Sequence, residues 1–392
     1  MTDTIEQHQA NSLEADQPEA DQPEAGEIEA QIGAYAERLL MTGLSGMEAI
    51  TIALGRELGL YAALGRSATA SAAELAEVAA IAPRYAREWL EQQAAAGWIE
   101  VAGFNGPGGF ADSDTRRYAL SPAAQECLLR PESLASVGPL FDFLPSLALV
   151  YPTLREAFRT GAGVPYADYG VHDAQGDFNR PAFVNLLATQ WLPAIPGLVE
   201  RLARPGARVA EIGCGEGWAA VSVARAFPGV HVDGFDLDEA SVAAARKHAA
   251  TAGVADRVRF EVADVTNGRS LPGGGTYDLV CAFEMIHDLA RPVDALSTMR
   301  RLAKPDATVL VVDEKAGEVF EAATPNPVER LFYAASVLHC LPVGLAGDDS
   351  AGTGAVMRPP VFRGYATEAG FASVDMLPID YDLFHFYQLN LA

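Results

Sequence analysis

The sequence predicts an α/β fold, in which a mostly parallel sheet with helices on both faces follows a smaller helical domain. The first observation is a change of rhythm after Pro205 and Gly206, where short apolar runs begin to alternate with helical segments. Alternation of this kind places consecutive strands parallel to one another, with the helices as crossovers. The second observation is helical periodicity in the preceding part of the chain, which ends in two short strand-like runs.

The chain has 392 residues, of which 49% are hydrophobic, and is long enough for at least two domains. We expect an acidic tail at 1–30, a helical domain at 31–130, a helical linker and pocket roof at 131–205, and the α/β domain at 206–392, which carries an insertion at 317–360. The tail contains nine acidic residues, no lysine or arginine, and few apolar side chains. Because burial cannot offset the entropy lost on ordering it, we expect the tail to be disordered.

The helical domain shows the order of elements found in a winged helix. The expected elements are helices within 31–66, at 71–80 and at 83–96, followed by strands at 98–101 and 117–120. Ser71 and Glu74 form a capping box at the start of the second segment, and Pro83 suits the first position of the third. Helix, turn, helix and a two-stranded ribbon predict an N-terminal α-helical winged-helix domain.

The α/β domain divides into strands and helices by the same reasoning. Its five expected parallel strands are 208–212, 230–235, 258–262, 277–283 and 308–313. The expected helices between them are 217–227, 241–252 and 292–303, and the insertion contains another at 327–340. Two late runs, 374–378 and 383–389, are candidates for a closing antiparallel pair.

A glycine-rich segment, Glu211-Ile-Gly213-Cys-Gly215-Glu-Gly217, lies between the first strand and the first helix of the α/β domain. Glycines allow a sharp turn and let the backbone approach a ligand without a Cβ clash. The helix N-terminus beyond the turn favours an anionic group such as a carboxylate. In the dinucleotide fingerprint a third glycine would stand where this chain has Trp218, which argues against a dinucleotide ligand.

The ends of the next three strands carry side chains that suit a single nucleoside-like ligand. Asp236 ends the second strand and can accept both ribose hydroxyls, and Leu237 beside it can lie against an adenine face. Asp264 and Val265 follow the third strand, where the carboxylate can accept the adenine amino group, and Phe283 ends the fourth. Asp236 could instead cap a helix and Asp264 a turn, but four strand ends in register favour the binding site.

Residues 207–314 resemble the class I S-adenosylmethionine-dependent methyltransferases, whose glycine motif, ribose-binding acid and adenine-contacting acid match 211–217, Asp236 and Asp264. The resemblance implies a Rossmann-like domain with S-adenosyl-L-methionine as its cofactor. A broader stretch, about 40–392, is similar to bacterial proteins that join a winged helix to that domain, some of them labelled transcriptional regulators. The segments that carry this resemblance are Gly163-Val-Pro-Tyr166, Asn179-Arg-Pro-Ala-Phe183, Trp191-Leu-Pro-Ala194, Ile286-His287-Asp288 and Gly370-Phe371.

The pair His287-Asp288 is similar to that of small-molecule O-methyltransferases of the plant and polyketide type, in which the histidine is the general base. The resemblance implies this role for His287, although Leu289 stands where those enzymes usually have tryptophan. A base is needed only if the acceptor holds a proton that leaves as the bond forms, and Glu284 is the second candidate. A structural histidine is an equally good interpretation. The resemblance also implies that Tyr166 closes over the methionine part of the cofactor.

The acceptor is expected between the winged-helix side and the carboxyl edge of the sheet, because ligands of open α/β sheets bind beyond the strand ends. Segments 140–170 and 317–360 would roof this site, and they are rich in aromatic and aliphatic side chains but sparse in lysine and arginine. We therefore expect a small, largely apolar or aromatic acceptor rather than a phosphorylated one. The side chains predicted to line its site are Phe141, Tyr169, Tyr333 and Val337.

The charge of the chain bears on its partners. The net charge is −24, and residues 31–130 contain eight arginines, no lysine and eleven acids, which argues against nucleic acid as a partner. Two readings stay open: a small-molecule methyltransferase of specialised metabolism, and a ligand-sensing winged-helix regulator that binds the cofactor without turnover. A protein or nucleic-acid methyltransferase is a third, weaker reading. The apolar helices at 31–66 favour a homodimer.

Localisation and metal binding follow from what the sequence lacks. No apolar run approaches the roughly 20 residues of a membrane span, and the first thirty residues contain no secretory signal, so we expect a cytoplasmic protein with no membrane partner. The four cysteines, Cys127, Cys214, Cys281 and Cys340, lie far apart in the chain. Because their spacing matches no zinc motif, we expect free thiols and no metal.

Overall fold

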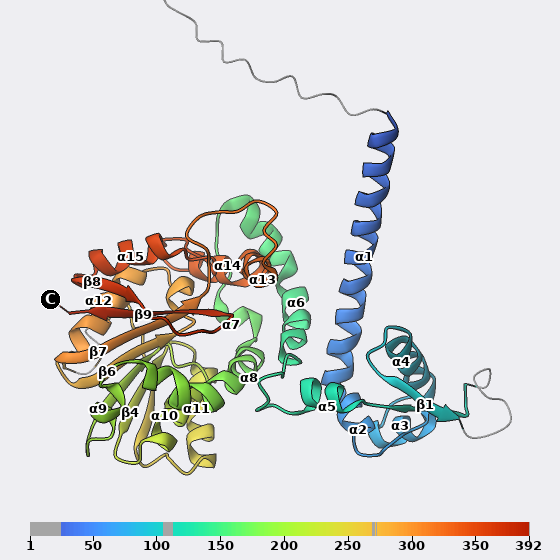
Figure 1. Ribbon diagram of the computed structural model, residues 1–392, viewed down its shortest axis with the longest axis horizontal. Coiled ribbons are helices and arrows are strands. Elements are labelled where there is room, and N and C mark those ends of the chain that lie inside the picture. Colours follow the sequence, from blue (N-terminus) through green and yellow to red (C-terminus); the bar gives the residue numbers. More distant parts are fainter. Residues whose placement is uncertain (1–24, 105–112, 269–270, 272, 392) are drawn as a thin grey trace, which may run out of the picture. The chain divides into compact units, whose positions relative to one another are not determined.

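The computed structural model describes residues 25–104, 113–268, 271 and 273–391 (Figure 1). The chain divides into two compact units, one that ends at Glu48 and one that begins at Ala49. The described part of the first unit belongs to helix α1 (Ala25–Glu57). Residues 1–24 of the predicted acidic tail lie outside the described residues, but the expectation of disorder was wrong for 25–30, which are the first turns of α1.

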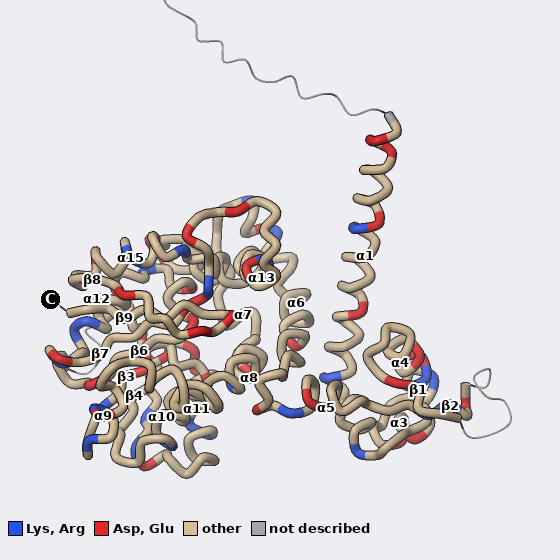
Figure 2. Tube along the Cα trace, in the orientation of Figure 1, with Lys and Arg blue, Asp and Glu red and all other residues tan. Residues whose placement is uncertain are grey.

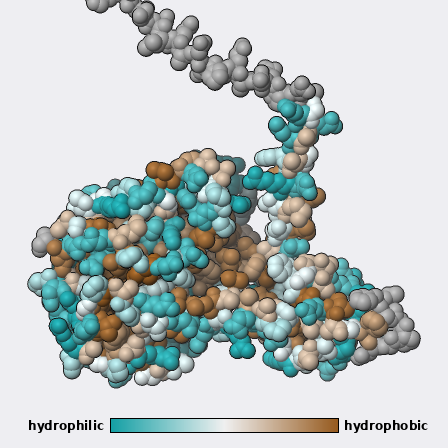
Figure 3. Space-filling view, in the orientation of Figure 1, coloured by the Kyte–Doolittle hydropathy of each residue, from teal (hydrophilic) through white to brown (hydrophobic). Residues whose placement is uncertain are grey.

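Helix α1 starts early because its first residues are good helix formers and because Ile28 extends the apolar spacing of the following turns. Most of its apolar side chains face solvent, and brown and tan atoms mark them along the helix in Figure 3. The exposed large apolar side chains of α1 are Ile28, Ile32, Tyr35, Leu39, Leu40, Met41, Leu44, Met47, Ile50 and Leu54. Near the end of α1, Ile52 and Ala53 are buried, so the exposed apolar side chains lie mostly in the turns before them.

The winged-helix order is confirmed in the part of the chain that follows. Its elements are α2 (Leu60–Leu64), α3 (Ala72–Ala79), α4 (Pro83–Ala95), β1 (Glu100–Phe104), β2 (Arg116–Ala119) and α5 (Pro122–Leu129). The capping box is present, since the backbone N–H of Ser71 donates to the Glu74 carboxylate at 2.7 Å and that of Glu74 to the Ser71 hydroxyl at 3.3 Å. The two strands are displaced from the expected runs by one to three residues, and most of the glycine-rich loop lies outside the described residues.

Helices fill the linker between the winged helix and the sheet. They are α6 (Pro139–Thr160), α7 (Tyr166–Tyr169), α8 (His172–Ala182), the π-helical segment η2 (Phe183–Trp191), the short η3 (Leu192–Ala194) and α9 (Leu198–Leu202). Trp191 and Leu187 are fully buried in the core that η2 shares with the sheet. Segment η2 therefore anchors α8, whose first residues reach the functional site.

The sheet has seven strands in the order β5-β4-β3-β6-β7-β9-β8. The strands are β3 (Arg208–Ile212), β4 (His231–Asp236), β5 (Val258–Val262), β6 (Tyr277–Phe283), β7 (Ala303–Glu314), β8 (Ser373–Met376) and β9 (Phe384–Asn390). Strands β3 to β7 are parallel, and β9 and β8 pair antiparallel, so the expected Rossmann-like sheet with its closing antiparallel pair is confirmed. From β3 the chain adds β4 and β5 on one side and then β6 and β7 on the other. Ligands of such folds bind at this switch point, between the carboxyl ends of β3 and β6.

Helices cover both faces of this sheet, as Figure 1 shows. One face packs against α10 (Trp218–Ala226) and α11 (Glu239–Thr251), and the other against α12 (Pro292–Leu302) and α15 (Pro359–Glu368). Strand β6 is buried on both sides, since Leu279 and Cys281 point into the first core while Val280 and Ala282 point into the second. Burial on both faces is the reason for its apolar run at 279–283.

The insertion before β8 contains the expected helix, here α13 (Pro327–Ala335) continued by the π-helical turn η6 (Ser336–Cys340), and then α14 (Leu341–Leu345). Helix α15 was not expected, because its two initial prolines resemble a helix breaker, although proline is well tolerated in the first turn. Among the described helices, none is long and apolar enough to cross a membrane.

Substitution of Gly234 by alanine in the central strand β4 is expected to destabilise the protein by about 1–3 kcal/mol through overpacking. A Cβ at this position would lie 2.6 Å from the ring of Phe260 and 3.1 Å from Cβ of Cys214. Thermal unfolding of G234A measures the loss. The matched control is Gly364→Ala in α15, where a Cβ would meet nothing within 4 Å, and an equal loss in both variants would contradict the packing argument.

Candidate active site

A pocket of about 670 Å³ lies at the carboxyl ends of β3, β4, β5 and β6, closed by residues of α7, α8 and α14. Among its lining residues are all those predicted to bind the cofactor: Glu211, Gly213, Gly215, Gly217, Trp218, Asp236, Leu237, Asp264, Val265, Phe283 and Tyr166. Glu284 lines it as well. Segments from 166 to 284 thus converge on one cavity, as four strand ends in register predict.

The glycine turn takes the shape that only glycine adopts without strain. Gly213, Gly215 and Gly217 have φ angles of 65°, 48° and 74°. The backbone N–H groups of Gly213 and Cys214 donate to the carbonyl of Phe235, at 2.8 and 3.0 Å, and fix the turn against β4. A Cβ on Gly215 would meet nothing within 4 Å, so this position leaves open space on the pocket side of the turn.

Asp236 holds the turn and keeps acceptor capacity for a ligand. Its Oδ2 accepts the backbone N–H of Gly215 at 2.7 Å, and its Oδ1 that of Asp238 at 2.9 Å. Each carboxylate oxygen has a second lone pair, which can accept a hydroxyl from the pocket. Burial raises the pKa of Asp236 above its ordinary value, and the hydrogen bonds from Asp238 and Gly215 oppose that rise.

Glu211 is a buried carboxyl group whose Oε2 has no hydrogen-bond partner among the described residues. Burial raises its pKa to about 8, and the charge of Asp236 adds to the rise. Such a group at a pocket wall is costly unless a ligand satisfies it. A ligand that brings a positive charge near Glu211 would lower its pKa and pair with it.

The side of the pocket toward β5 is shaped to take a flat group. Leu237 is 70% exposed, which leaves its side chain free to cover a ring, while Val265 is buried beneath. Asp264 accepts from the backbone and the hydroxyl of Thr266, at 2.9 and 2.6 Å. Its second oxygen lies 3.8 Å from Arg291 and stays accessible.

The opposite side is closed by Tyr166 and Trp218. The Tyr166 hydroxyl donates to the side chain of Gln175 at 3.2 Å, which ties α7 to α8. The indole N–H of Trp218 donates to Glu216 at 3.3 Å, and its ring stacks on His248. Burial raises the pKa of Glu216 to about 8, and the hydrogen bond to Asp173 adds to this rise.

Glu284 follows β6 directly and has φ of +50°, a conformation that a non-glycine residue adopts at a cost. Its backbone N–H donates to the carbonyl of Val312 at 2.8 Å, and its carboxylate accepts the side-chain N–H of Asn179. Both side chains line the pocket. Burial raises the pKa of Glu284 to about 7, against the hydrogen bond from Asn179, which lowers it.

His287 lies behind the pocket wall and is 2% exposed. Its Nδ1 is 2.6 Å from carboxylate oxygens of both Asp313 and Glu314, and its Nε2 is 3.1 Å from Asp288. Burial lowers the pKa of His287, but the three carboxylates outweigh it and raise the pKa well above the ordinary value. Of this group, Asp288 is among the residues that line the pocket and His287 is not.

The four residues predicted to bind the acceptor lie outside the pocket lining. Phe141 packs against the winged-helix core, and the hydroxyl of the buried Tyr169 donates to the carbonyl of Leu338 at 3.0 Å. The Tyr333 hydroxyl accepts from Arg358 at 2.7 Å, and Val337 is 44% exposed. Phe141 of α6, Tyr169 of α7 and Tyr333 of α13 thus contact neighbouring elements rather than the strand ends.

Several lining residues were not predicted to bind a ligand. They are His172, Gln175, Gly176, Asn179, Asp238, Ser241, Arg291 and Asp348, together with Met285, Glu216 of the glycine motif and Asp288 of the His287-Asp288 pair. Asn179 and Asp288 belong to segments that carry the family resemblance, which was the available signal for them. Residues of α8 could not be placed otherwise, since they reach the pocket through tertiary packing.

Comparison with known proteins agrees with this fold and pocket. Residues 210–309 match a family described as a methyltransferase domain, and residues 46–130 match the Rv2258c-like winged HTH domain. The ubiquinone biosynthesis O-methyltransferase of Pseudomonas aeruginosa is 29% identical over 214 residues, which are 54% of this chain and 81% of that protein. The enzyme of the same name from Hahella chejuensis is 31% identical over 44% of this chain, a match that spans 65% of its own length, just under two thirds.

Solved structures share the fold over nearly the whole chain. The mitomycin 7-O-methyltransferase MmcR has a TM-score of 0.66 at 22% identity, covering 93% of this chain and all of that one. Human N-acetylserotonin methyltransferase in complex with SAM has a TM-score of 0.66 at 16% identity, covering 91% of this chain and 98% of that one. PigF with SAH has a TM-score of 0.67 at 19% identity, over 90% and 99%.

Residues 210–309 are thus a methyltransferase domain, preceded by an Rv2258c-like winged HTH domain at residues 46–130, and the chain is a methyltransferase that uses S-adenosylmethionine as its cofactor. The pocket fits that cofactor in two respects. Asp236 retains lone pairs for ribose hydroxyls, and the unpartnered carboxyl group of Glu211 suits a cationic ligand.

Proposed function

We propose that this chain transfers a methyl group from S-adenosylmethionine to a small, largely apolar or aromatic acceptor in specialised metabolism. The observation that carries the proposal is the pocket itself, whose lining includes the apolar Phe183, Leu289 and Val343 besides the cofactor residues. Among the described residues that line it, Arg291, beside Asp264, is the only arginine or lysine, which disfavours a phosphorylated acceptor. Relatives are named as a mitomycin 7-O-methyltransferase and a ubiquinone biosynthesis O-methyltransferase, which supports a small-molecule acceptor.

The experiment is a screen of small aromatic and polycyclic acceptors with the purified protein, in which mass spectrometry detects a product heavier by one methyl group. Release of S-adenosylhomocysteine in step with that product is the expected result. If only phosphorylated or macromolecular acceptors were methylated, the proposed acceptor class would be wrong.

The predicted cofactor residues divide between the ribose, the adenine and the methionine end of S-adenosylmethionine. Asp236 accepts the ribose hydroxyls, and Asp264 with Leu237 and Val265 holds the adenine. Tyr166, Trp218 and the glycine turn enclose the methionine end, with Glu211 and Phe283 at the floor. The contacts of Asp236 and Glu211 described above support this division, because they leave acceptor atoms free on the pocket side.

Glu284 is the general base in this proposal. When bound, the cofactor supplies an activated methyl group, so the chain has only to align the acceptor and take its proton. Glu284 lines the pocket, and Asn179 holds its carboxylate in place. His287 is less suited, because it lies behind the wall with both ring nitrogens facing carboxylates.

We also propose that the protein is a homodimer, in which the apolar face of α1 is covered by a second copy. The support is the row of exposed apolar side chains on α1, most of which precede the buried Ile52. Light scattering at micromolar concentration is expected to give twice the mass of 41.5 kDa. Leu39→Glu with Met47→Glu would then yield a monomer, whereas a monomeric wild type would contradict the proposal.

A regulator that binds the cofactor without turnover is the alternative from another class, suggested by the winged helix. Figure 2 shows both signs of charge on α4 and β1, rather than a basic face. Of its arginines, Arg87 pairs with Asp114 and Arg116 with Glu91, so these charges are already neutralised. A gel-shift assay with genomic fragments is therefore expected to show no retarded band.

A further inference from the structure

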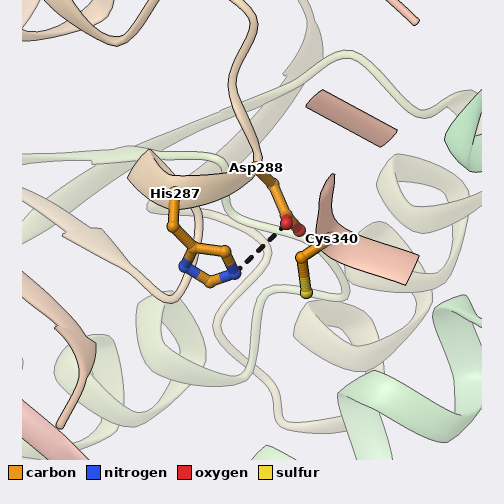
Figure 4. A group of neighbouring side chains, drawn as sticks. All are labelled: His287, Asp288 and Cys340. Atoms are coloured by element: carbon orange, nitrogen blue, oxygen red, sulfur yellow. Dashed lines mark ion pairs between the residues drawn. The ribbon is translucent and has the colours of Figure 1, made fainter. Parts of the chain in front are cut away.

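A second group of reactive side chains lies where the turn η5 (Ile286–Asp288) meets η6. Figure 4 shows His287 and Asp288 from the first turn facing Cys340 from the second. One ring nitrogen of His287, one carboxylate oxygen of Asp288 and the sulfur of Cys340 all lie within 4.8 Å of one another. His287 and Cys340 are buried, with 2% and 7% of their surface exposed.

The polar atoms of this group are incompletely hydrogen bonded. Oδ1 of Asp288 lies 3.1 Å from Nε2 of His287 but without the alignment of a hydrogen bond, and it has no other partner among the described residues. Nε2 of the buried His339, next to Cys340 in the chain, also lacks a partner there. Buried polar atoms without partners are rare in folded proteins, and a bound ion is one of the few explanations.

The ring nitrogen of His287 that faces away from Cys340 makes the hydrogen bond that is usual for a metal-binding histidine. Its Nδ1 donates to a carboxylate oxygen of Asp313 at 2.6 Å, and Asp313 is 1% exposed. A histidine that binds a metal through one nitrogen almost always donates the other N–H to a carboxylate or carbonyl group, which fixes its tautomer and orientation. Nε2, on the side of Asp288 and Cys340, is then the nitrogen that can bind.

We propose that Nε2 of His287, the carboxylate of Asp288 and the sulfur of Cys340 bind a divalent metal ion of the zinc type. Imidazole, thiolate and carboxylate are the donors that Zn²⁺ takes in proteins. Binding releases the protons of Nε2 and of the thiol to solvent, since only the unprotonated atoms are ligands. Three protein ligands leave one position of a tetrahedron open, as in zinc sites that take part in reactions.

The proposed metal site adjoins the methyl-transfer pocket, because Asp288 is both a proposed metal ligand and a residue that lines the pocket. None of its three ligands is among the residues assigned to the cofactor. An imidazolium ion between carboxylates would account for the contacts of His287 alone. It would leave the sulfur of Cys340 in a 3.7 Å contact with Nδ1 of His339, whereas a metal ion would join that sulfur to His287 and Asp288. The sequence could not indicate the site, since its ligands come from two distant segments rather than from one spaced motif.

The test uses the full-length protein, stripped of metal by chelation and dialysed, with Co²⁺ as an optical probe and Zn²⁺ as the competing ion. We expect one equivalent of Co²⁺ to produce a near-ultraviolet sulfur-to-cobalt charge-transfer band, and one equivalent of Zn²⁺ to abolish it. Cys340→Ser should lose the band. The matched control is Cys281→Ser, a buried thiol of β6 in contact with the carbonyl of Ala210, which should keep it.

Asp313→Asn tests the orientation of the ring without touching a ligand and should weaken Zn²⁺ binding by roughly 10- to 100-fold in calorimetry. Circular dichroism and binding of S-adenosylhomocysteine establish that each variant is folded. If C340S fails to fold, Asp288→Asn takes its place. A wild-type protein that binds no Co²⁺ or Zn²⁺, or a charge-transfer band that survives in C340S, would overturn the proposal whether or not the enzyme is active.

Discussion

Replacement of Asp236 by alanine is expected to weaken the binding of S-adenosylhomocysteine roughly 30- to 1000-fold, about 2–4 kcal/mol, because two charge-assisted hydrogen bonds to the ribose are lost. The variant also leaves the backbone N–H groups of Gly215 and Asp238 without their acceptor, which loosens the glycine turn. Calorimetric titration of the purified variant measures the affinity. It needs no acceptor, so it tests the cofactor site independently of the reaction.

Asp233→Ala is the matched control for this measurement. Asp233 lies on the same strand but toward its other end, where it pairs with Arg208 at 2.6 Å, outside the pocket lining. We expect its loss to lower stability without changing the affinity. Unchanged affinity in a folded D236A protein would mean that the ribose is held elsewhere, and the assignment of the whole strand-end site would have to be abandoned.

The sequence was sufficient to predict the fold and the cofactor residues where local chemistry and periodicity decide the structure. Strands β3, β5 and β6 have the predicted bounds, because apolar residues recur along one or both faces of each strand between clear turn signals. The glycine turn and Asp236 were found for a similar reason. Parallel strands end at one edge of the sheet, so residues that follow them must meet once the strands are correctly assigned.

The acceptor side could not be predicted in this way, because tertiary packing decides it. Asn179 reaches Glu284 from a helix more than a hundred residues earlier in the chain, and nothing in either local sequence indicates that contact. The roof residues Phe141 and Tyr333 were chosen for their aromatic character alone, but their helices turn them toward other elements. The pair His287-Asp288 was found by resemblance, whereas the carboxylates behind the ring come from the end of β7.

Glu284→Gln is expected to lower turnover by roughly 10²–10⁴-fold with any acceptor that loses a proton, while cofactor affinity stays unchanged. Glutamine keeps the shape of the side chain and can still accept the hydrogen bond from Asn179, so the variant removes the base and little else. A base acts when deprotonated. Since the pKa of Glu284 is about 7, wild-type turnover should rise as the pH increases through 7, and the variant should lose this rise.

His287→Ala separates the two candidate bases under the same assay, once the screen has supplied an acceptor. If His287 takes the proton, H287A loses turnover and E284Q retains it, which would contradict our assignment.

The protein without acceptor offers a second measurement, the pH dependence of its melting temperature. A carboxyl group whose pKa is raised in the folded state stabilises the fold below its unfolded pKa, and this contribution is lost as the pH rises through the folded value. For Glu284 the window runs from about 4.5 to about 7. The melting temperature of the wild type should therefore fall across that window relative to E284Q, whereas parallel melting curves would show that Glu284 is not held in a strained, partly neutral state at the pocket wall.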